Sequence, residues 1–331
     1  MNLMFARGVL VVGDGPAGCA AAISAARAGC AVTMVGSGRT RAVPECASAA
    51  AIRLLDAIAP ELTAGTDIWL DQRGRGNARV EGRALDRARL DTGLREAAVR
   101  AGVGYRTMPA AMLRPCVDGH RVVGVMGVEN LPPLPGGGPD AGALAVIDAT
   151  GVNGWLRRSL DLTEAIDSRP WWLQRGFGTL DARHGERARH PATQFAIGPD
   201  GWLWWHATPQ GCIWTALCGT RDAGLAWPAG MQPVGRIWRE CRRWRHLRQA
   251  AGEGFFVCGD AAGYLDPASG DGLRFALESG ARAGALAAGV VRWPQRTSLA
   301  AALYVDWVLQ TYQAGRAALA GVYARANLSV R

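Results

Sequence analysis

Lysine is absent from this sequence, and all 37 basic residues among its 331 are arginine. Without a lysine amine the chain cannot form a Schiff base, and it cannot supply the lysine of a phosphate-binding P-loop. We interpret the net charge of +9 as a compositional bias toward arginine. We therefore expect no nucleic-acid partner, although a basic chain can indicate one.

Patterns typical of metal sites and membrane spans are missing as well. The eight cysteines form no C-x-x-C pair and no zinc-site spacing with histidine, so we expect no metal. No run of 18 apolar residues occurs, and a first strand at about Gly8 leaves no room for a signal peptide. These features favour a globular protein of the reducing cytoplasm without a transmembrane segment.

What the sequence does contain begins with a strand, a glycine-rich turn and a helix. The apolar run 9–12 precedes Gly13-Asp14-Gly15-Pro16-Ala17-Gly18, an alanine-rich helix to about residue 28, and a second apolar run over 30–35. A G-x-G-x-x-G turn between a strand and a helix is the fingerprint of a dinucleotide-binding βαβ unit. The alternative is that the glycines serve only a tight turn.

Each glycine of this turn has a physical role in the dinucleotide interpretation. Gly13 permits the tight turn, Gly15 lets the backbone approach a pyrophosphate, and Gly18 lets the helix pack against the strand. A positive φ at Gly15 would add a second reason for glycine there.

One part of the fingerprint is missing. The second strand should end in Asp or Glu to bind the ribose hydroxyls, yet it runs into Gly36-Ser37-Gly38-Arg39. Either Ser37 and the neighbouring backbone take that role, or Arg39 or Arg41 binds a phosphate of the ligand.

Apolar spacing predicts the other elements. Helices are expected over 47–62, 87–101 and 236–248, buried strands over 143–147 and 255–258, a strand over 121–128, a hairpin over 68–80 and a loop over 130–142. Residues 201–206 and 213–217 alternate as two antiparallel strands. This alternation places Trp202 and Trp204 on one face and Leu203 and Trp205 on the other.

Two later strands also end in small-residue turns with an acidic group. The first leads into Asp148-Ala149-Thr150-Gly151 and the second into Gly259-Asp260-Ala261-Ala262, followed by Asp266-Pro267 and Gly270-Asp271-Gly272. The carboxyl ends of parallel strands meet at one edge of a sheet. We therefore expect these segments and the 13–18 turn to surround one long ligand.

Together these motifs resemble the FAD-binding fold of para-hydroxybenzoate hydroxylase, whose superfamily includes flavin monooxygenases, flavin halogenases and geranylgeranyl reductases. The resemblance covers about residues 8–160 and 250–290, and it includes Glu45 before a helix and Arg87 with Asp91. Pro44-Glu45-Cys46-Ala47 followed by A-x-x-L-L is most similar to the branch that modifies protein-bound tryptophan in quinone-cofactor maturation. Without lysine, the lysine-dependent chemistry of flavin halogenases is set aside.

The resemblance implies an α/β chain with a Rossmann-like FAD-binding domain and an inserted antiparallel-sheet substrate domain. We assign 1–66, 84–160 and 251–331 to the first and 67–83 and 161–250 to the second. The implied FAD-binding residues are Gly13, Gly15, Pro16, Ala17, Gly18, Ser37, Arg39, Arg41, Arg87, Asp148, Gly151, Gly259, Asp260, Pro267, Gly270, Gly272 and Leu273. Two further departures are Val152, where an arginine commonly follows D-A-T-G, and a short middle segment of about 100 residues.

That middle segment, 154–252, holds ten of the thirteen tryptophans. Its indoles either cover the flavin with an aromatic pocket or simply form a core. The arginines of the 236–248 helix and of 183–189 either face solvent or attract an acidic partner. A short segment favours an open cleft, which suits an aromatic ring tethered to a peptide or carrier protein better than a free metabolite.

Two functions fit these features. The first is a FAD-dependent monooxygenase that uses NADH or NADPH and O2 to hydroxylate an electron-rich, tryptophan-like aromatic. The second is a flavin-dependent reductase of a carbon–carbon double bond, with Cys46 as a proton donor; a non-catalytic flavin-binding role is a minor third. Candidate catalytic residues are Glu45, close to the reactive face of the flavin, Cys46, and His206 as a proton shuttle. Cys46 and His206 each have a purely structural alternative.

Overall fold

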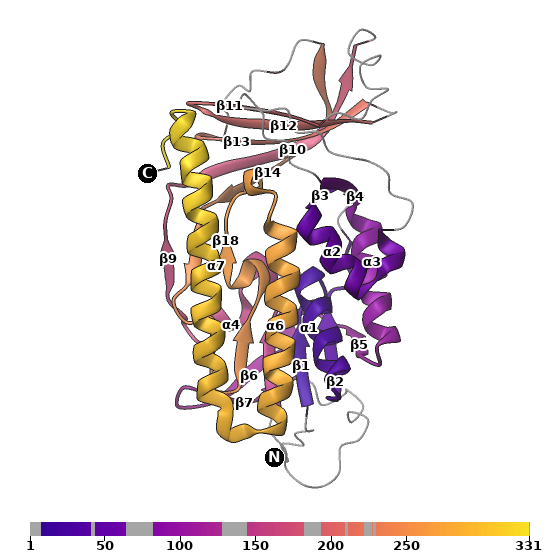
Figure 1. Ribbon diagram of the computed structural model, residues 1–331, viewed down its shortest axis with the longest axis vertical. Helices are drawn as coiled ribbons and strands as arrows, with labels where there is room; N and C mark the ends of the chain where they lie inside the picture. The colour runs from indigo at the N-terminus through magenta and orange to yellow at the C-terminus, as the bar shows by residue number, and fades with distance from the viewer. Residues whose placement is uncertain are drawn as a thin grey trace.

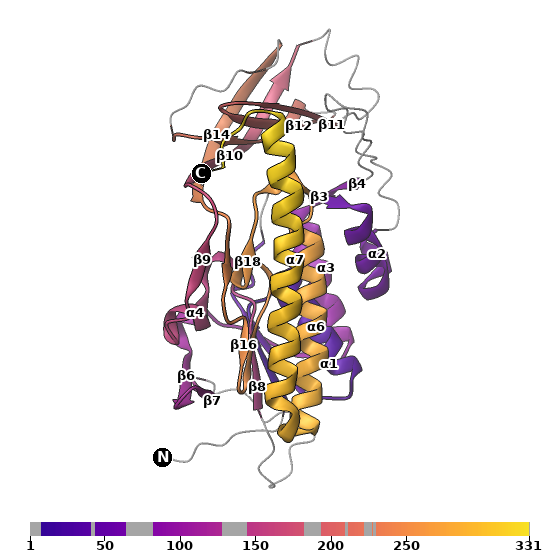
Figure 2. The same ribbon diagram turned by 60° about the vertical axis from the view of Figure 1, so that its left-hand side comes forward.

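The computed structural model describes residues 8–40, 44–63, 82–127, 144–181, 193–208, 211–221, 227 and 230–330. The molecule is elongated, with a parallel sheet and its helices in the lower part and an antiparallel sheet across the other end (Figures 1 and 2). The long helices α6 (Gly272–Arg292) and α7 (Thr297–Arg325) run side by side along it. The predicted α/β class with an antiparallel sheet is confirmed.

The parallel sheet has the order β16-β17-β8-β1-β2-β5. Its members are β16 (Ala251–Gly252), β17 (Phe255–Val257), β8 (Leu144–Asp148), β1 (Gly8–Val12), β2 (Val32–Gly36) and β5 (Gly104–Thr107). Only β16 pairs antiparallel with its neighbour. Every residue of β1 and β2 is buried, as expected for strands covered on both faces.

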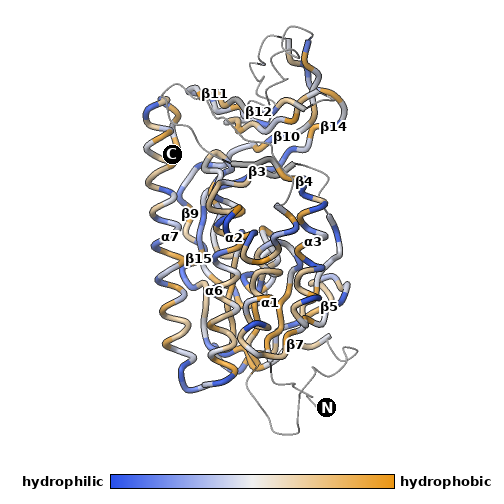
Figure 3. Tube along the Cα trace, turned by 45° about the vertical axis from the view of Figure 1, so that its right-hand side comes forward, coloured by the Kyte–Doolittle hydropathy of each residue, from blue (hydrophilic) through white to orange (hydrophobic). Residues whose placement is uncertain are grey.

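Helices flank this sheet. They are α1 (Pro16–Arg27), α2 (Ala49–Ile58), α3 (Arg87–Arg100), the short α4 (Trp155–Ser159) and α6. The helices predicted over 47–62 and 87–101 are confirmed, and a 3₁₀ turn at Pro60–Leu62 completes the first. Hydrophobic segments gather at α1 and the adjoining part of α6, whereas the turn between α6 and α7 is hydrophilic (Figure 3).

Helices α1 and α6 pack unusually close together because α6 presents glycines to α1. A Cβ atom at Gly280 would lie 2.1 Å from the carbonyl oxygen of Ala17, and one at Gly284 would lie 2.1 Å from that of Ala21. The matched spacing of four residues shows that the two helices run in the same direction. It also fixes their relative register, with Ala17 beside Gly280.

The antiparallel sheet has the order β11-β12-β13-β10-β14. Its members are β11 (Thr193–Gly198), β12 (Gly201–Thr208), β13 (Gly211–Cys218), β10 (Trp171–Leu180) and β14 (Met231–Arg242). The predicted tryptophan hairpin is confirmed, since β12 pairs with β13 and Trp205 lies opposite Trp214. Its two faces are also as predicted, because Trp202 and Trp204 belong to one hydrophobic cluster and Leu203 and Trp205 to another.

The helix predicted over 236–248 is wrong. These residues form the end of β14 and the short strand β15 (Arg245–Leu247), which pairs with β9 (Glu164–Ile166) and β18 (Gly263–Tyr264). Apolar residues at 237, 241 and 244 imitate a helical stripe, but β14 pairs with β10 over most of its length. Arg236 and Arg239 lie exposed on this edge strand.

The remaining elements are two hairpins, β3 (Pro44–Ser48) with β4 (Gly82–Asp86), and β6 (Arg114–Asp118) with β7 (Arg121–Met126). The hairpin expected over 68–80, the loop over 130–142 and the arginines of 183–189 lie outside the described residues. No described helix is long and apolar enough to cross a membrane. Within the described ranges, no His, Cys, Asp and Glu side chains cluster as a metal site would require.

Candidate cofactor site

The turns that follow β1, β8 and β17 meet at the carboxyl edge of the parallel sheet, as the sequence predicts. The amide of Ala149 donates to the carbonyl of Val12 at 2.7 Å, and the amide of Cys258 donates to that of Asp148 at 2.9 Å. A Cβ atom at Gly13 would lie 2.2 Å from the carbonyl oxygen of Ala149. The three segments therefore form one continuous surface.

Within the first turn, the need for glycine differs between positions. Gly13 has a φ of +114° and no space for a side chain, and a Cβ atom at Gly18 would lie 1.9 Å from the oxygen of Gly13. Gly15 is the N-cap of α1 with a φ of −79°, so the positive φ considered for it is wrong. No atom lies within 4 Å of a Cβ built at Gly15, so this glycine leaves open space in front of the helix N-terminus.

Three further glycines at this end of the sheet have open space in front of them. Gly151, Gly270 and Gly272 likewise have no atom within 4 Å of a built Cβ. Gly272 opens α6 eight residues before Gly280, which lies beside Ala17. At 1.5 Å per helical residue, the N-terminus of α6 projects about 12 Å beyond the level of Ala17. An extended ligand can therefore contact both helix N-termini along one edge.

The side chain of Asp148 stabilises the turn that follows β8. Its carboxylate accepts hydrogen bonds from the amide and hydroxyl of Thr150 at 2.9 and 2.7 Å and from the amide of Leu156 at 2.7 Å. It is fully buried, and this burial raises its pKa despite the three donors. The side chain of Asp148 therefore holds the turn together from inside, and the predicted contact of this residue with the cofactor stays a prediction.

The segment after β17 combines buried and accessible positions. Gly259 has a φ of +59°, its amide donates to Ser279 Oγ at 2.9 Å, and a Cβ there would meet that of Ala17 at 2.9 Å. Ala17 is therefore a packing residue between the turns. Asp260 is partly exposed, and its carbonyl accepts from Arg245 at 2.7 Å.

Farther along this segment, Pro267 is exposed in the 3₁₀ turn Pro267–Ser269 and Gly270 follows it with a φ of +64°. Leu273 is 5% exposed and belongs to the core. Pro16, at the first position of α1, is also buried. Pro267 and Gly270 thus lie at the surface near the start of α6, whereas Leu273 and Pro16 support it from inside.

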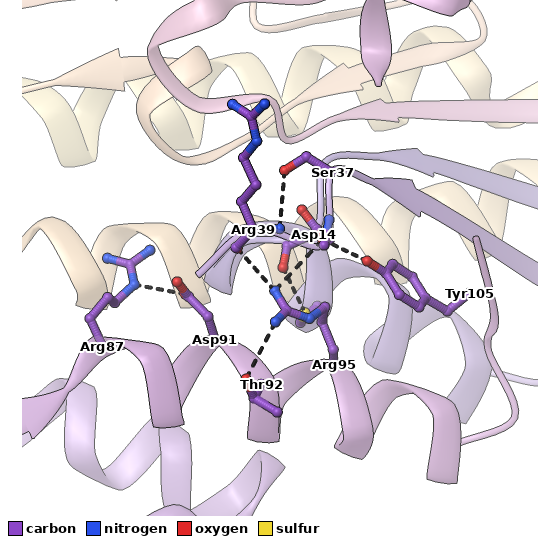
Figure 4. Close-up of polar contacts among 10 residues, drawn as sticks. Asp14, Ser37, Arg39, Arg87, Asp91, Thr92, Arg95 and Tyr105 are labelled. Atoms are coloured by element: carbon purple, nitrogen blue, oxygen red, sulfur yellow. Dashed lines mark hydrogen bonds and ion pairs between the residues drawn. The ribbon is translucent and has the colours of Figure 1, made fainter. Parts of the chain in front are cut away.

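The place of the missing ribose acid is filled by another carboxylate. A Cβ atom at Gly36 would lie 2.1 Å from Cγ of Asp14 and 2.4 Å from its Oδ1. Asp14 belongs to the glycine-rich turn, and Figure 4 shows its carboxylate between Tyr105 and Arg95. The sequence reasoning did not assign this residue to the site, although an acidic residue inside G-x-G-x-x-G was a visible signal.

The residues proposed as substitutes for that acid lie nearby. Ser37 Oγ accepts from the amide of Arg39 at 3.4 Å, which fixes the loop after β2. The carbonyl of Arg39 accepts from Arg95 at 3.3 Å. The guanidinium of Arg39 points away from Asp14 (Figure 4). Arg41 lies outside the described residues.

Arg87 opens α3 beside this loop. Its Nε lies 2.7 Å from Oδ1 of Asp91, which is 4% exposed, so a largely buried carboxylate holds the guanidinium in place (Figure 4). Asp86 caps the helix through the amides of Ala88 and Arg89. The pairing of Arg87 with Asp91 noted in the sequence is confirmed as an ion pair.

Asp266, to which the sequence analysis gave no role, is a buried carboxylate that connects the antiparallel sheet with the parallel-sheet half of the fold through hydrogen bonds. Asp266 Oδ2 accepts from the indole of Trp244 at 2.6 Å and from the hydroxyl of Tyr323 at 2.8 Å, and its Oδ1 accepts from the amide of Ala268 at 3.0 Å. Tyr323 in turn accepts from the indole of Trp202 at 2.6 Å. The network ties α7 and the antiparallel sheet to the turn before α6.

Four tryptophans in and next to the antiparallel sheet form cores. Trp171, Trp202, Trp214 and Trp244 are at most 3% exposed. A cavity of about 30 Å³ lies among Trp204, Trp214 and Trp238, which is space for about one water molecule rather than an aromatic ring. The core alternative therefore holds for these four indoles.

The three catalytic candidates lie in two strands of different sheets. Glu45 and Cys46 lie in β3 opposite Leu85 and Ala84, between the helices of the parallel sheet and the antiparallel sheet (Figures 1 and 2); their side chains are outside the described part. His206 lies in β12 opposite Ile213 and is 2% exposed. Burial lowers the pKa of His206, so the imidazole is neutral at pH 7.

Residues 7–107 match the family model described as pyridine nucleotide-disulphide oxidoreductase. Comparison with curated protein sequences found no match.

Among solved structures, the flavin-dependent brominase Bmp2 aligns with a TM-score of 0.72 at 19% identity, over 91% of this chain and 83% of that one. The peptidyl tryptophan dihydroxylase QhpG, described as essential for tryptophylquinone cofactor biogenesis, aligns with a TM-score of 0.68 at 21% identity, over 94% and 73%. A geranylgeranyl bacteriochlorophyll reductase-like protein from Thermoplasma acidophilum aligns with a TM-score of 0.66 at 18% identity, over 93% and 86%. The resemblance inferred from the motifs is thus confirmed at the level of fold: the chain has the fold of flavin-dependent halogenases, a tryptophan dihydroxylase and a geranylgeranyl reductase-like protein.

Proposed function

We propose that the protein is a FAD-dependent oxidoreductase, of the monooxygenase type. The observation that carries this proposal is the register of α1 and α6, whose N-termini point in the same direction about 12 Å apart along the helix axis, with open space at Gly15, Gly270 and Gly272. Helix N-termini favour anionic ligands, and glycine backbone permits their close approach. A dinucleotide as long as FAD suits this extended edge.

Within this proposal, 1–66, 84–160 and 251–331 form the FAD-binding domain and 67–83 and 161–250 the substrate domain. Backbone of the 13–18 turn binds the pyrophosphate, with Asp260 closing the site from the C-terminal half. Pro267, Gly270 and Gly272 contact the ring system, and Arg87 and the loop of Ser37 and Arg39 border the adenosine end. FAD supplies the redox chemistry when bound, and NADH or NADPH is the proposed reductant.

The first test is direct. The purified protein should show a flavin absorption spectrum, and heating should release FAD. Gly15→Val should retain less than a tenth of the wild-type FAD, because its side chain enters the space that the pyrophosphate needs. Since that space holds no protein atom within 4 Å, the variant should fold normally.

The matched control is Gly289→Val in α6, where a Cβ atom also meets nothing within 4 Å but which lies on the exposed side of the helix, far from the sheet edge. It should retain FAD like the wild type. Normal FAD content in a folded Gly15→Val variant would show that the ligand binds elsewhere.

For the substrate, we propose an electron-rich, tryptophan-like ring held in a peptide or on a carrier protein. The fold likeness to a peptidyl tryptophan dihydroxylase supports this class, and exposed Arg236 and Arg239 on β14 can attract an acidic carrier. Turnover of the same ring in an acidic peptide should exceed turnover of the free ring and should fall with added salt. Efficient, salt-insensitive turnover of the free ring would contradict the tethered substrate.

The second candidate is a reductase of a carbon–carbon double bond, supported by the fold likeness to the geranylgeranyl reductase-like protein. Cys46 in β3 is then the proposed proton donor, whereas Glu45 and His206 are the candidates in the monooxygenase. Oxygen dependence separates the two. Peroxide release during NAD(P)H oxidation in air favours the monooxygenase, and anaerobic turnover of an alkene favours the reductase.

A further inference from the structure

The loop after β2 leaves a gap in the dinucleotide fingerprint at Gly36, and the structure fills that gap from a different segment. The carboxylate of Asp14 lies directly over Gly36, so close that any side chain at 36 would collide with Cβ and Cγ of Asp14. Position 36 is where the fingerprint expects its ribose-binding acid. An acid at 14 and a side chain at 36 are therefore mutually exclusive.

Two hydrogen-bond donors and one guanidinium hold one oxygen of this carboxylate. Oδ2 of Asp14 accepts from the amide of Gly38 at 2.8 Å and from the hydroxyl of Tyr105 at 2.8 Å, and Arg95 lies 3.7 Å away (Figure 4). Burial and the hydrogen bond to Asp14 raise the pKa of Tyr105, so its phenol stays protonated and donates. The side chain is consequently fixed from β5, from α3 and from the loop after β2.

The other oxygen is left for a further donor. Within the described ranges of the chain no hydrogen bond reaches Oδ1 of Asp14, and the side chain keeps 10% of its surface exposed at the carboxyl edge of the sheet. A partly buried carboxylate oxygen gains substantially from a hydroxyl donor.

We propose that Asp14 is the residue that recognises the adenosine ribose of the cofactor, as an acid relocated from the end of β2 to the phosphate-binding turn. Oδ2 anchors the side chain and Oδ1 accepts from a ribose hydroxyl. Gly36 is required because it makes room for this arrangement, and Tyr105 and Arg95 are positioning residues. The inference rests on the proposed binding of FAD and adds the group that selects its ribose.

The test measures binding by the flavin-free protein, from quenching of flavin fluorescence, rather than turnover. Asp14→Asn keeps the shape of the side chain but not its charge, and it should weaken FAD binding about ten- to a hundredfold. Wild type should prefer FAD to an analogue that lacks the adenosine 2′-hydroxyl, and Asp14→Asn should lose that preference. Asp118→Asn, an exposed carboxylate on β6, controls for the loss of one negative charge.

Moving the acid gives a second, independent test. Gly36→Glu alone should lose FAD binding, because the new side chain collides with Asp14. The double variant Asp14→Gly/Gly36→Glu should regain both FAD affinity and the preference for the 2′-hydroxyl. Circular dichroism and melting temperature check that each variant is folded.

The outcomes separate the inference from the proposed function. Wild-type affinity and an unchanged 2′-hydroxyl preference in Asp14→Asn would overturn the role of Asp14 while leaving FAD binding intact. So would a Gly36→Glu variant that binds FAD as tightly as the wild type. A wild-type protein that binds no flavin would overturn both.

Discussion

The close packing of α1 on α6 makes a quantitative prediction at Gly284. A Cβ atom there would lie 2.1 Å from the carbonyl oxygen of Ala21, whereas an ordinary contact requires about 3.4 Å, so Gly284→Ala must push the helices apart by roughly 1 Å. Overpacking of this kind costs about 1–3 kcal/mol. Because the obstacle is backbone, which cannot rotate away, we expect a cost at the upper end of that range. Alanine's higher helix propensity returns about 1 kcal/mol, which leaves a net loss of about 2 kcal/mol.

Gly289 lies in the same helix and provides the matched control. A Cβ atom at this exposed position meets nothing within 4 Å, so Gly289→Ala should gain about 1 kcal/mol from helix propensity alone. Urea unfolding followed by far-ultraviolet circular dichroism measures both free energies of unfolding, and they should differ by about 3 kcal/mol. Because α1 carries the glycine-rich turn, FAD affinity should also fall in Gly284→Ala only. Equal stability of the two variants would refute the close helix contact.

Two predictions concern the buried network around Asp266. Tyr323→Phe removes one donor to the carboxylate and the acceptor of Trp202, so it should lower the free energy of unfolding by about 2–4 kcal/mol. The control Tyr312→Phe should lower it by about 1 kcal/mol, because its partner Asp167 is partly exposed. Equal losses in the two variants would contradict a large contribution of the buried network to stability. Burial raises the pKa of Asp266 above its ordinary value of 3.8, so the folded protein holds a proton that the unfolded chain releases, and stability should decline as pH rises from 3.8 through the raised pKa. Melting temperatures from pH 4 upward should show a steeper decline in wild type than in Asp266→Asn, which keeps the raised pKa of buried Asp148. Parallel profiles of the two proteins would argue against this contribution of Asp266.

The elements that sequence reasoning predicted correctly are those whose signal is local. The strand before Gly13, the helix after Gly15 and the turns at Asp148 and Gly259 combine an apolar run with a turn of fixed spacing, and the structure brings them together. Each of these patterns is complete within about 20 residues. Their meeting at one edge then follows from the parallel arrangement of the strands.

The errors have the opposite origin. The apolar spacing at 237, 241 and 244 suits a helix, but pairing with β10, about 60 residues earlier in the chain, determines the strand instead. Similarly, Asp266 collects donors from Trp244 and Tyr323, which are distant in sequence. No local sequence pattern predicts such a contact, because Asp266, Trp244 and Tyr323 are each compatible with many environments. The buried state of Asp148 could not be seen either, because D-A-T-G looks the same whether its carboxylate faces a ligand or its own turn.

Gly36 departs from the dinucleotide motif, and this departure is coupled to the presence of Asp14 in the glycine-rich turn. Considered alone, it removes the acid that a dinucleotide site needs and weakens the expectation of a cofactor. Considered with Asp14, it is the condition that allows a carboxylate to occupy the same place from a neighbouring strand end. If Asp14 binds the ribose as we propose, one six-residue turn contacts both the pyrophosphate and the ribose. Because the contacts that hold Asp14 come from Gly38, Tyr105 and Arg95, the same proposal predicts that the loop after β2, β5 and α3 affect cofactor affinity without touching the phosphates.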